Sequence, residues 1–273
     1  MPFRSNIGLS LNSKRRKNFF FKLLSFLAFL FVLFIFISIC SYYPDFRIKD
    51  ISVSGNSTVS SEEIVNIVKN ILSKKYLFVL NRDNQIFLPR FGIEETLLDN
   101  LKKIESIRVG ISGVQGINIY VVERSVFALW CDGGSITSND CYFIDKNGII
   151  FSDAPIFFGN PFPKYLGGHS GTNIIGTNFL DERVFTELSS LFKGIYNLNI
   201  NPVGVLSLPE GEYEIYLFDG GKININDKQD FNVSLRNLKA LIDSGDIKTD
   251  KTFLSKIKHI DLRYGNKVHY DFK

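Results

Sequence analysis

The chain has 273 residues, 45% of them hydrophobic and 14% aromatic, so it can bury one large core or two modest ones and is not a disordered chain. Its net charge of +4 is unevenly placed, because the first 44 residues hold six basic side chains and no acid, which leaves 26 basic against 28 acidic residues elsewhere. A near-neutral body lacks the basic face that nucleic acid requires, so we expect no nucleic-acid partner.

An apolar run near the N-terminus has the length of a membrane span. Leu23–Cys40 holds 18 residues without a charge, Pro or Gly, and as a helix it would extend about 27 Å. The six basic residues precede it and the first acid, Asp45, follows it, so the positive-inside rule places the N-terminus in the cytoplasm. We therefore expect a basic cytoplasmic tail over 1–18, a transmembrane helix over 19–43, and the remainder outside the cytoplasmic membrane, in a periplasmic or extracellular position.

Two alternatives to a retained anchor fit the residues less well. A cleaved signal peptide would have a shorter apolar core with an A-x-A-like site after it, and the sequence has neither. A lipoprotein site at Cys40 would need a small residue before the cysteine, where the chain has Ile39. The pattern favours a single-pass anchor that is retained.

Residues 44–125 are expected to form a small α+β domain. Apolar residues alternate along 46–53 with one slip, as in a bulged strand, and Ser60 with Glu63 is a helix-capping signal. Two amphipathic helices can cover one face of a three-stranded sheet. The expected strands are 46–53, 106–114 and 117–123, the expected helices are 61–73 and 93–104, and the short apolar run 76–80 lies between the helices.

Residues 126–273 are strand-rich, and we expect two or so helices packed on a mixed or antiparallel sheet. The stretch 155–171 is rich in Pro and Gly and is predicted to be a loop. The segment 257–272 is extended, and Gly265-Asn266 within it allows either one bent strand or a hairpin. Strands are expected at 127–130, 142–144, 149–151, 203–208, 213–218 and 222–226, and helices at 181–196 and 231–244.

Two of the three cysteines are candidates for a disulfide. Cys131 and Cys141 flank a nine-residue loop between two apolar runs, so a hairpin would bring them opposite each other. In an oxidising compartment we expect a disulfide that stabilises the fold by about 2–3 kcal/mol. Two free thiols in a reducing compartment are the alternative, and a metal pair is disfavoured because no other Cys and no nearby His completes a site.

The sequence contains no recognisable catalytic arrangement. His169, His259 and His269 form no HExxH motif, and the run Gly167–Gly171 lacks the spacing of a GxSxG nucleophile elbow. No P-loop and no GxGxxG motif is present. We therefore expect no catalytic residue, no cofactor and no metal site, and a chain whose function is binding.

The layout and several motifs resemble the bacterial cell-division family FtsQ/DivIB. Ile51–Asn56 is similar to the opening strand and turn of the family's POTRA domain, and Ile119–Trp130 to its strand with a Glu-Arg pair and an Ala-x-Trp motif. Tyr142–Phe151 resembles the family's I-D-x-x-G-x-x-F hairpin, while Tyr213–Ile223 and Ile260–Tyr264 resemble its C-terminal elements. In their order and spacing these pieces cover roughly residues 14–273.

The resemblance implies a non-enzymatic divisome scaffold in the cytoplasmic membrane at the division site, with a POTRA domain over 44–125 and a β domain over 126–273. It implies partners of the paired coiled-coil FtsB/FtsL type, bound by the last strand of the β domain, and other division proteins bound by the POTRA domain. A terminal edge strand offers unpaired N–H and C=O groups to such a partner. Tyr264 and Arg263 are the preferred anchors, since Tyr and Arg dominate interface hot spots. The expected partner-binding residues are Ile260, Asp261, Leu262, Arg263, Tyr264, Val268 and Tyr270.

Three alternatives stay open at this point. Tyr264 can be ordinary packing and Arg263 a solvated surface residue. The chain can be a different anchored POTRA protein that acts in protein export or envelope assembly, although such proteins usually carry several POTRA units or a barrel. An anchored cell-wall enzyme would require a catalytic constellation that only the fold assembles.

Overall fold

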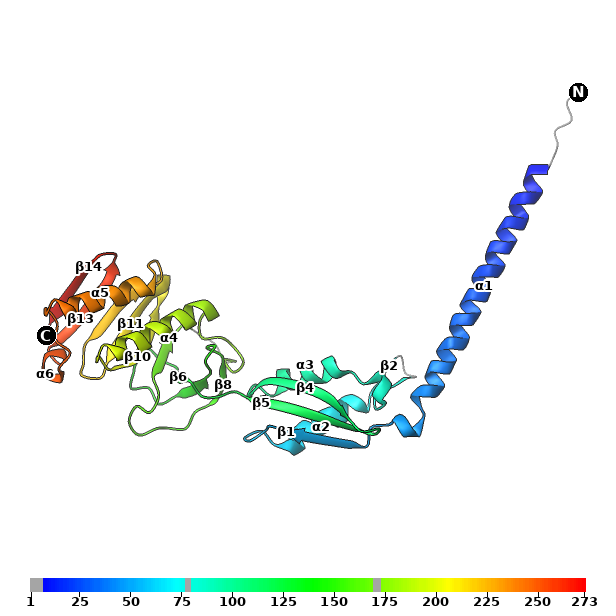
Figure 1. Ribbon diagram of the computed structural model, residues 1–273, viewed down its shortest axis with the longest axis horizontal. Helices are drawn as coiled ribbons and strands as arrows, with labels where there is room; N and C mark the ends of the chain where they lie inside the picture. The colour runs from blue at the N-terminus through cyan, green and yellow to red at the C-terminus, as the bar shows by residue number, and fades with distance from the viewer. Residues whose placement is uncertain (1–6, 77–79, 169–172) are drawn as a thin grey trace, which may run out of the picture. The chain divides into compact units, whose positions relative to one another are not determined.

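The computed structural model describes residues 7–76, 80–168 and 173–273, and it is a mixed α+β protein with an N-terminal apolar helix and a large mixed sheet (Figure 1). Its internal contacts divide the chain between Glu123 and Arg124 into a first unit and a second unit. The predicted apolar run 76–80 falls largely outside the described residues.

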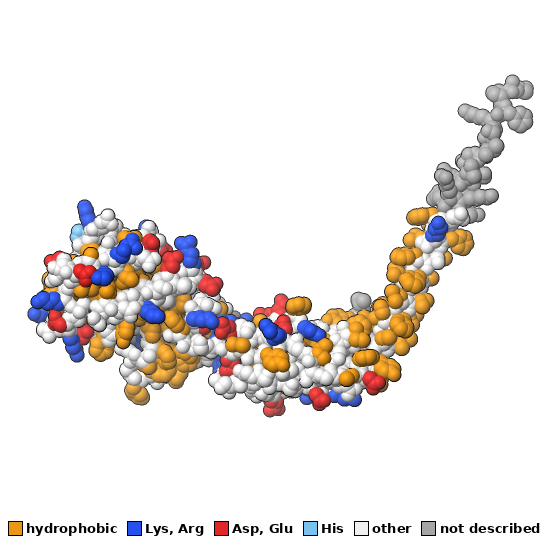
Figure 2. Space-filling model, in the orientation of Figure 1, with side chains coloured by type: hydrophobic (Ala, Val, Ile, Leu, Met, Phe, Trp, Pro, Cys, Tyr) orange, Lys and Arg blue, Asp and Glu red, His pale blue; other side chains and the backbone are white. Residues whose placement is uncertain are grey.

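The N-terminal helix, α1 (Ile7–Ser41), is the one described helix that is long and apolar enough to cross a membrane. Its apolar part, Asn18–Ser41, has 24 residues with a mean hydropathy of 3.0. Apolar side chains cover this part of the helix in Figure 2, as expected for a helix surrounded by lipid rather than packed on a core. The helix therefore has the length and composition of a membrane anchor or of a signal sequence.

The rest of the first unit is a three-stranded sheet with two helices on one face. The sheet order is β1-β5-β4, with β1 parallel and β4 antiparallel to the central strand β5. Apolar residues from the helices and from the inner face of the sheet, including Ile64, Leu97 and Ile119, form its core. The elements are β1 (Asp50–Ser54), α2 (Ser61–Leu72), β2 (Lys75–Tyr76), β3 (Leu80–Asn81), α3 (Arg90–Asn100), β4 (Ile104–Ser112) and β5 (Gly116–Glu123).

Two predicted boundaries in the first unit are wrong. The first strand begins at Asp50 rather than at residue 46, because Pro44–Phe46 forms a 3-10 turn that Pro44 favours through its fixed φ. The second helix spans Arg90–Asn100 rather than 93–104. Ile104 instead begins β4, since the apolar spacing at the end of the helix fits a following strand equally well.

Glu123 fastens the end of β5 to the turn before α2. Its carboxylate accepts hydrogen bonds from the backbone N–H groups of Ser57, Thr58 and Val59 at 2.7–2.9 Å and from the Thr58 hydroxyl at 2.6 Å. Partial burial alone would raise the pKa of Glu123, but these hydrogen bonds outweigh it and lower the pKa to about 2. Glu123, the acidic member of the Glu123-Arg124 pair, therefore stabilises the fold of the first unit.

In the second unit, nine described strands form one mixed sheet in the order β14-β13-β12-β11-β10-β9-β6-β7-β8. Helices α4 (Glu182–Asn197) and α5 (Phe231–Asp243) lie over the same face of this sheet (Figure 1) and share its main core. The strands are β6 (Ala128–Cys131), β7 (Cys141–Ile144), β8 (Ile150–Asp153), β9 (Lys164–Gly167), β10 (Pro202–Leu208), β11 (Glu212–Leu217), β12 (Lys222–Asn226), β13 (Ile257–Tyr264) and β14 (Lys267–Phe272).

The prediction of a loop over 155–171 is wrong in its middle, because the stretch contains β9. This strand lies between β6 and β10, runs parallel to both, and buries Tyr165 and Leu166. It has only four residues, and Pro163 and Gly167 lie at its two ends, so neither its length nor its periodicity marks it in the sequence.

Arg124 and Asp145 clamp the β7–β8 hairpin of the second unit. The Arg124 guanidinium donates to the Asp145 carboxylate at 2.5 Å, and Asp145 also accepts from the N–H groups of Asn147 and Ile149. Gly148 follows with a φ of +81°, and a Cβ there would lie 2.9 Å from the ring of Phe185. The Asp and Gly of the I-D-x-x-G hairpin therefore both have structural roles in the fold.

Candidate functional site

The C-terminal segment is a hairpin and not one bent strand. β13 and β14 pair antiparallel around a turn at Gly265 and Asn266, and Gly265 adopts a φ of +63°. The side-chain amide of Asn237, on α5, donates to the carbonyl of Gly265 at 2.6 Å. The helix layer thus fixes the turn and with it the position of the final strand.

The predicted edge strand 260–264 is an interior strand, which corrects that expectation. β13 lies between β12, to which it is parallel, and β14, to which it is antiparallel. Ile260 and Leu262 are fully buried and Asp261 is 6% exposed. The reason is that residues 267–272 fold back and occupy the edge themselves, so these three residues cannot receive a partner strand.

The edge strand of the sheet is β14, which has no neighbour on its outer side among the described residues. The N–H of Lys273 donates inward to the carbonyl of Lys256 at 2.8 Å, whereas the N–H of Phe272 reaches only the side chain of Asp271. Since N–H and C=O groups alternate in direction along a strand, those of Val268, Tyr270 and Phe272 point outward. These main-chain groups are available to a partner, apart from the N–H of Phe272, which already donates to the Asp271 carboxylate.

The side chains of β14 place two aromatic rings beside this open backbone. Tyr270 pairs with Ile260 across the hairpin, so Val268, Tyr270 and Phe272 lie on the core side of the sheet. Val268 packs against the core, but Tyr270 remains 39% exposed and Phe272 43% exposed. Their ring centroids are 5.8 Å apart, so they form one apolar strip along the edge.

Tyr264 contributes a third exposed ring, next to the turn. The register of the hairpin shifts between Asp261 and Tyr264, which releases Tyr264 from the regular alternation. Tyr264 is 57% exposed, and its ring packs edge-to-face on His269 at 5.4 Å between centroids. Tyr264 is therefore a surface residue rather than core packing.

The Arg263 side chain forms ion pairs within the second unit. Its guanidinium donates to Asp261 at 2.5 Å and to Glu212, on β11, at 2.9 Å. Burial alone would raise the pKa of Asp261, but the hydrogen bonds from Arg263 lower it. Arg263 thus neutralises a buried carboxylate and braces the bulge beneath Tyr264, a role that differs from the free interface anchor expected from the sequence.

The structure therefore brings together three of the seven predicted partner-binding residues at one surface. Tyr264, Val268 and Tyr270 lie at the edge, whereas Ile260, Asp261 and Leu262 lie inside the sheet and Arg263 supports it. Sequence reasoning missed Phe272, although the alternation of apolar and polar residues through 268–272 was a sufficient signal. We call the outward side of β14 with Tyr264, Val268, Tyr270 and Phe272 the C-terminal edge.

Cys131 and Cys141 are paired in register on β6 and β7 and form a disulfide, with an S–S distance of 2.07 Å. The loop that they close folds back over the sheet, where the carbonyl oxygens of Ile136 and Ser138 accept hydrogen bonds from Lys164 Nζ at 3.0 and 2.9 Å. The pair lies in a small apolar cluster on the sheet face opposite the main helices. Its contacts are those of a structural staple.

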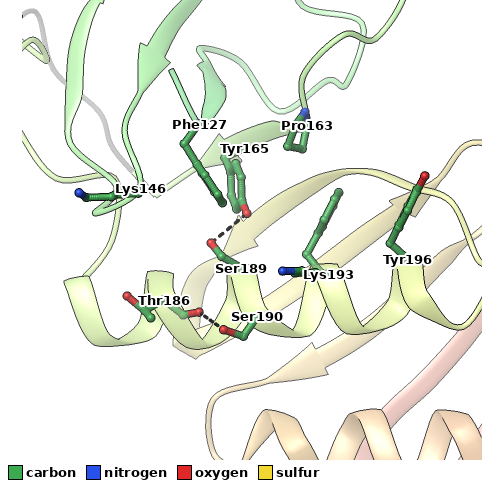
Figure 3. A pocket seen from close by; sticks show the side chains of 10 residues that line it. Phe127, Lys146, Pro163, Tyr165, Thr186, Ser189, Ser190, Lys193 and Tyr196 are labelled. Atoms are coloured by element: carbon green, nitrogen blue, oxygen red, sulfur yellow. Dashed lines mark hydrogen bonds between the residues drawn. The ribbon is translucent and has the colours of Figure 1, made fainter. Parts of the chain in front are cut away.

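A cavity of about 430 Å³ lies between α4 and the β6–β9 part of the sheet (Figure 3). The serine hydroxyl groups of its lining are already engaged: Ser189 pairs with Tyr165 at 3.2 Å, and Ser190 donates to the carbonyl of Thr186 at 2.9 Å. Burial raises the pKa of Tyr165 to about 12, so the phenol stays protonated and cannot serve as a base near neutral pH. The described lining contains no His, Asp or Glu that would activate a hydroxyl.

The histidines noted in the sequence are the remaining titratable candidates. His259 lies on β13 and His269 on β14, while His169, together with most of the Gly167–Gly171 run, lies outside the described residues. Within the described ranges, no group of three or more His, Cys, Asp or Glu side chains is arranged to hold a metal ion.

No protein-family model matches this chain, and no curated protein matches it. An inference about its function therefore depends on the geometry of its own residues.

Proposed function

We propose that this chain is a non-enzymatic membrane scaffold of the FtsQ/DivIB type, which binds partner division proteins outside the cytoplasmic membrane through its C-terminal edge. The observation that carries the proposal is an open edge strand, β14, whose outward main-chain groups are flanked by the exposed rings of Tyr264, Tyr270 and Phe272.

The chemistry of this edge suits the addition of a strand. Each main-chain hydrogen bond that a partner completes contributes about 0.5–1.5 kcal/mol, and buried aromatic anchors add more. The apolar strip of Tyr270 and Phe272 supplies such anchors on one face of β14. The Tyr264 and His269 rings, which both carry polar groups, lie on the other face. An extended segment with alternating apolar residues, carried by a membrane-anchored coiled coil of the FtsB/FtsL type, fits this pattern.

The first unit is consistent with a POTRA domain. Its longer elements follow the strand, helix, helix, strand, strand order that the resemblance implies, and its sheet has the order β1-β5-β4. The Glu-Arg pair has a structural role in each unit, since Glu123 clamps the first and Arg124 the second. The basic residues that precede the apolar run Leu23–Cys40 favour an N-terminus in the cytoplasm, with residues 44–273 on the outer side.

Action in protein export or envelope assembly is the second candidate, and it rests on the same first unit. Cellular depletion separates the two functions. A division scaffold predicts filamentous or chained cells without septa and a fluorescent fusion at mid-cell, whereas an export protein predicts loss of exported proteins with normal septa.

The test uses the chain's own edge as a control. Wild type and Asp153→Ala, an exposed residue on the opposite edge strand β8, should restore septation in depleted cells. Tyr270→Pro should not restore it, because it removes an outward N–H and an exposed ring together. Septation restored by Tyr270→Pro would contradict binding through the C-terminal edge.

A further inference from the structure

The last turn of α1 is attached directly to β3 and to the segment that follows it. The side chain of Ser41 is fully buried, and its hydroxyl accepts a hydrogen bond from the N–H of Asn81 at 2.6 Å. Asn84, also fully buried, donates its side-chain amide to the carbonyls of Ser41 and Cys40 at 3.2 and 3.4 Å. These carbonyls are among the helix-end groups that lack an intrahelical partner, so Asn84 satisfies them.

The same segment is held from its other side. The N–H of Ile48 donates to the carbonyl of Asp83 at 2.7 Å, and Arg47 forms an ion pair with the Asp83 carboxylate at 2.6 Å. The carbonyl-type oxygen of the Asn84 side chain accepts from the N–H of Ile86 at 2.9 Å. Residues 80–84 are therefore fixed to the end of the apolar helix by direct hydrogen bonds.

Two cations lie close to this attachment point, each beside a tyrosine ring, and a third precedes them in the sequence. Lys75 Nζ lies 3.1 Å from the Tyr42 hydroxyl and 5.2 Å from the centre of its ring. The Arg82 guanidinium lies 4.3 Å from the centre of the Tyr76 ring, and Lys74, which directly precedes Lys75 in the sequence, is exposed. Among the described residues, no ion pair joins these three cations to a carboxylate, and Arg82 Nε is buried without a hydrogen-bond partner.

We propose that Lys74, Lys75 and Arg82 form a binding surface for the anionic phosphate headgroups of membrane lipids, at the point where α1 leaves the bilayer. The inference rests on the proposed function in one respect, that α1 is a membrane anchor. Tyr42 and Tyr43, 47% and 54% exposed at the end of the helix, lie where interfacial tyrosines sit.

Two physical reasons favour lipid phosphate as the ligand. A cation close to an anionic membrane surface gains about a fivefold increase in association, and guanidinium and ammonium groups donate strongly to phosphate oxygens. Because the segment is fixed to the helix end, these cations are held at headgroup level without the loss of chain entropy that a flexible loop would undergo. Bound headgroups would in turn restrain the first unit against the membrane.

The test measures lipid selectivity of the full chain in bilayers. Wild-type protein is reconstituted in vesicles, and electron spin resonance compares the association of spin-labelled phosphatidylglycerol with that of spin-labelled phosphatidylcholine at the protein surface. Lys74→Glu/Lys75→Glu should lower this selectivity by about fivefold or more. Lys103→Glu/Arg108→Glu makes the same charge change on exposed residues of the first unit, one just before β4 and one within it, and should leave selectivity unchanged.

A second variant tests Arg82. Lys75→Glu/Arg82→Glu should lower lipid selectivity more than Lys74→Glu/Lys75→Glu does. If replacement of Arg82 disturbs the local structure by removing its stacking on Tyr76, the Lys74/Lys75 variant still tests the proposal. Equal selectivity in wild type and in the Lys74/Lys75 variant would overturn the lipid-binding surface while leaving the anchor intact. Absence of any motionally restricted lipid in the wild-type sample would instead show that α1 does not span the bilayer, and would remove both proposals.

Discussion

The two edge strands of the nine-stranded sheet differ in whether their outward main-chain groups are hydrogen-bonded. At β8 the strand has four residues, and Ile150 both donates to the carbonyl of Thr177 at 2.9 Å and accepts from the N–H of Gly176 at 2.6 Å. At β14 the strand has six residues, and its outward groups lack such a cover among the described residues. An uncovered edge is an aggregation hazard that folded proteins normally avoid. The contrast supports the proposal that the open edge receives a partner.

Tyr270→Pro should have the largest effect on the difference between the two edges, because it prevents strand addition at the open edge. We expect partner affinity to fall by several hundredfold, about 3–4 kcal/mol, through loss of an outward hydrogen bond and an aromatic anchor. Tyr270→Ala, which keeps the N–H, should lose clearly less, as measured by calorimetry with a purified partner. Equal losses for the two variants would show that the side chain binds and the backbone does not.

Gly148→Ala tests the closed side of the sheet. The substitution combines a strained positive φ with a Cβ that would meet the ring of Phe185, so we expect the free energy of unfolding to fall by about 3 kcal/mol. Gly134→Ala has open space around it and should change stability by less than about 0.5 kcal/mol. Denaturant unfolding measures both, and partner affinity of the folded variants should stay at the wild-type level.

The disulfide should stabilise the second unit without contributing to binding. Replacing both Cys131 and Cys141 by Ser should lower the free energy of unfolding by about 2–3 kcal/mol. Alkylation of protein isolated from cells, with and without reductant, reports whether the two thiols are joined in the native compartment. Full alkylation without reductant would contradict a disulfide there, and lost partner binding in the folded double variant would contradict a purely structural role.

Tyr264→Ala should weaken partner binding by about 1–2 kcal/mol, since the ring is exposed beside β14. Arg263→Glu, by contrast, should act mainly on stability, because it places a carboxylate beside Asp261 and Glu212. Binding and unfolding measured on both variants separate the two roles. A binding loss for Arg263→Glu that exceeds its stability loss would restore Arg263 as an interface residue.

Acid should lower the free energy of unfolding of the first unit, and this is the smallest of the predicted effects. The folded pKa of Glu123 is about 2, below its ordinary value, so its contribution is present above pH 4.5 and is lost as the pH falls towards 2. After allowance for solvent screening we expect about 1 kcal/mol. Glu123→Gln should remove this part of the pH dependence and the exposed Glu95→Gln should not, as followed by unfolding between pH 5 and pH 2.

The sequence predicted the long apolar helix, the two helices of the second unit and most of its strands, because each has a clear period or composition. It could not reveal β9, a four-residue strand flanked by Pro and Gly whose place is set by pairing with β6 and β10. It pointed to the C-terminal segment but took β13 rather than β14 as the edge strand. Buried interior strands and exposed edge strands alternate alike in sequence, and only strand order separates them.

The most direct test of the account is site-specific photo-crosslinking in living cells. A photoreactive phenylalanine analogue at Tyr270 should crosslink a small single-pass protein with a coiled coil outside the membrane, and the same analogue at Asp153 on β8 should not. Absence of a crosslink at Tyr270, or the same product at both positions, would contradict a partner-binding C-terminal edge.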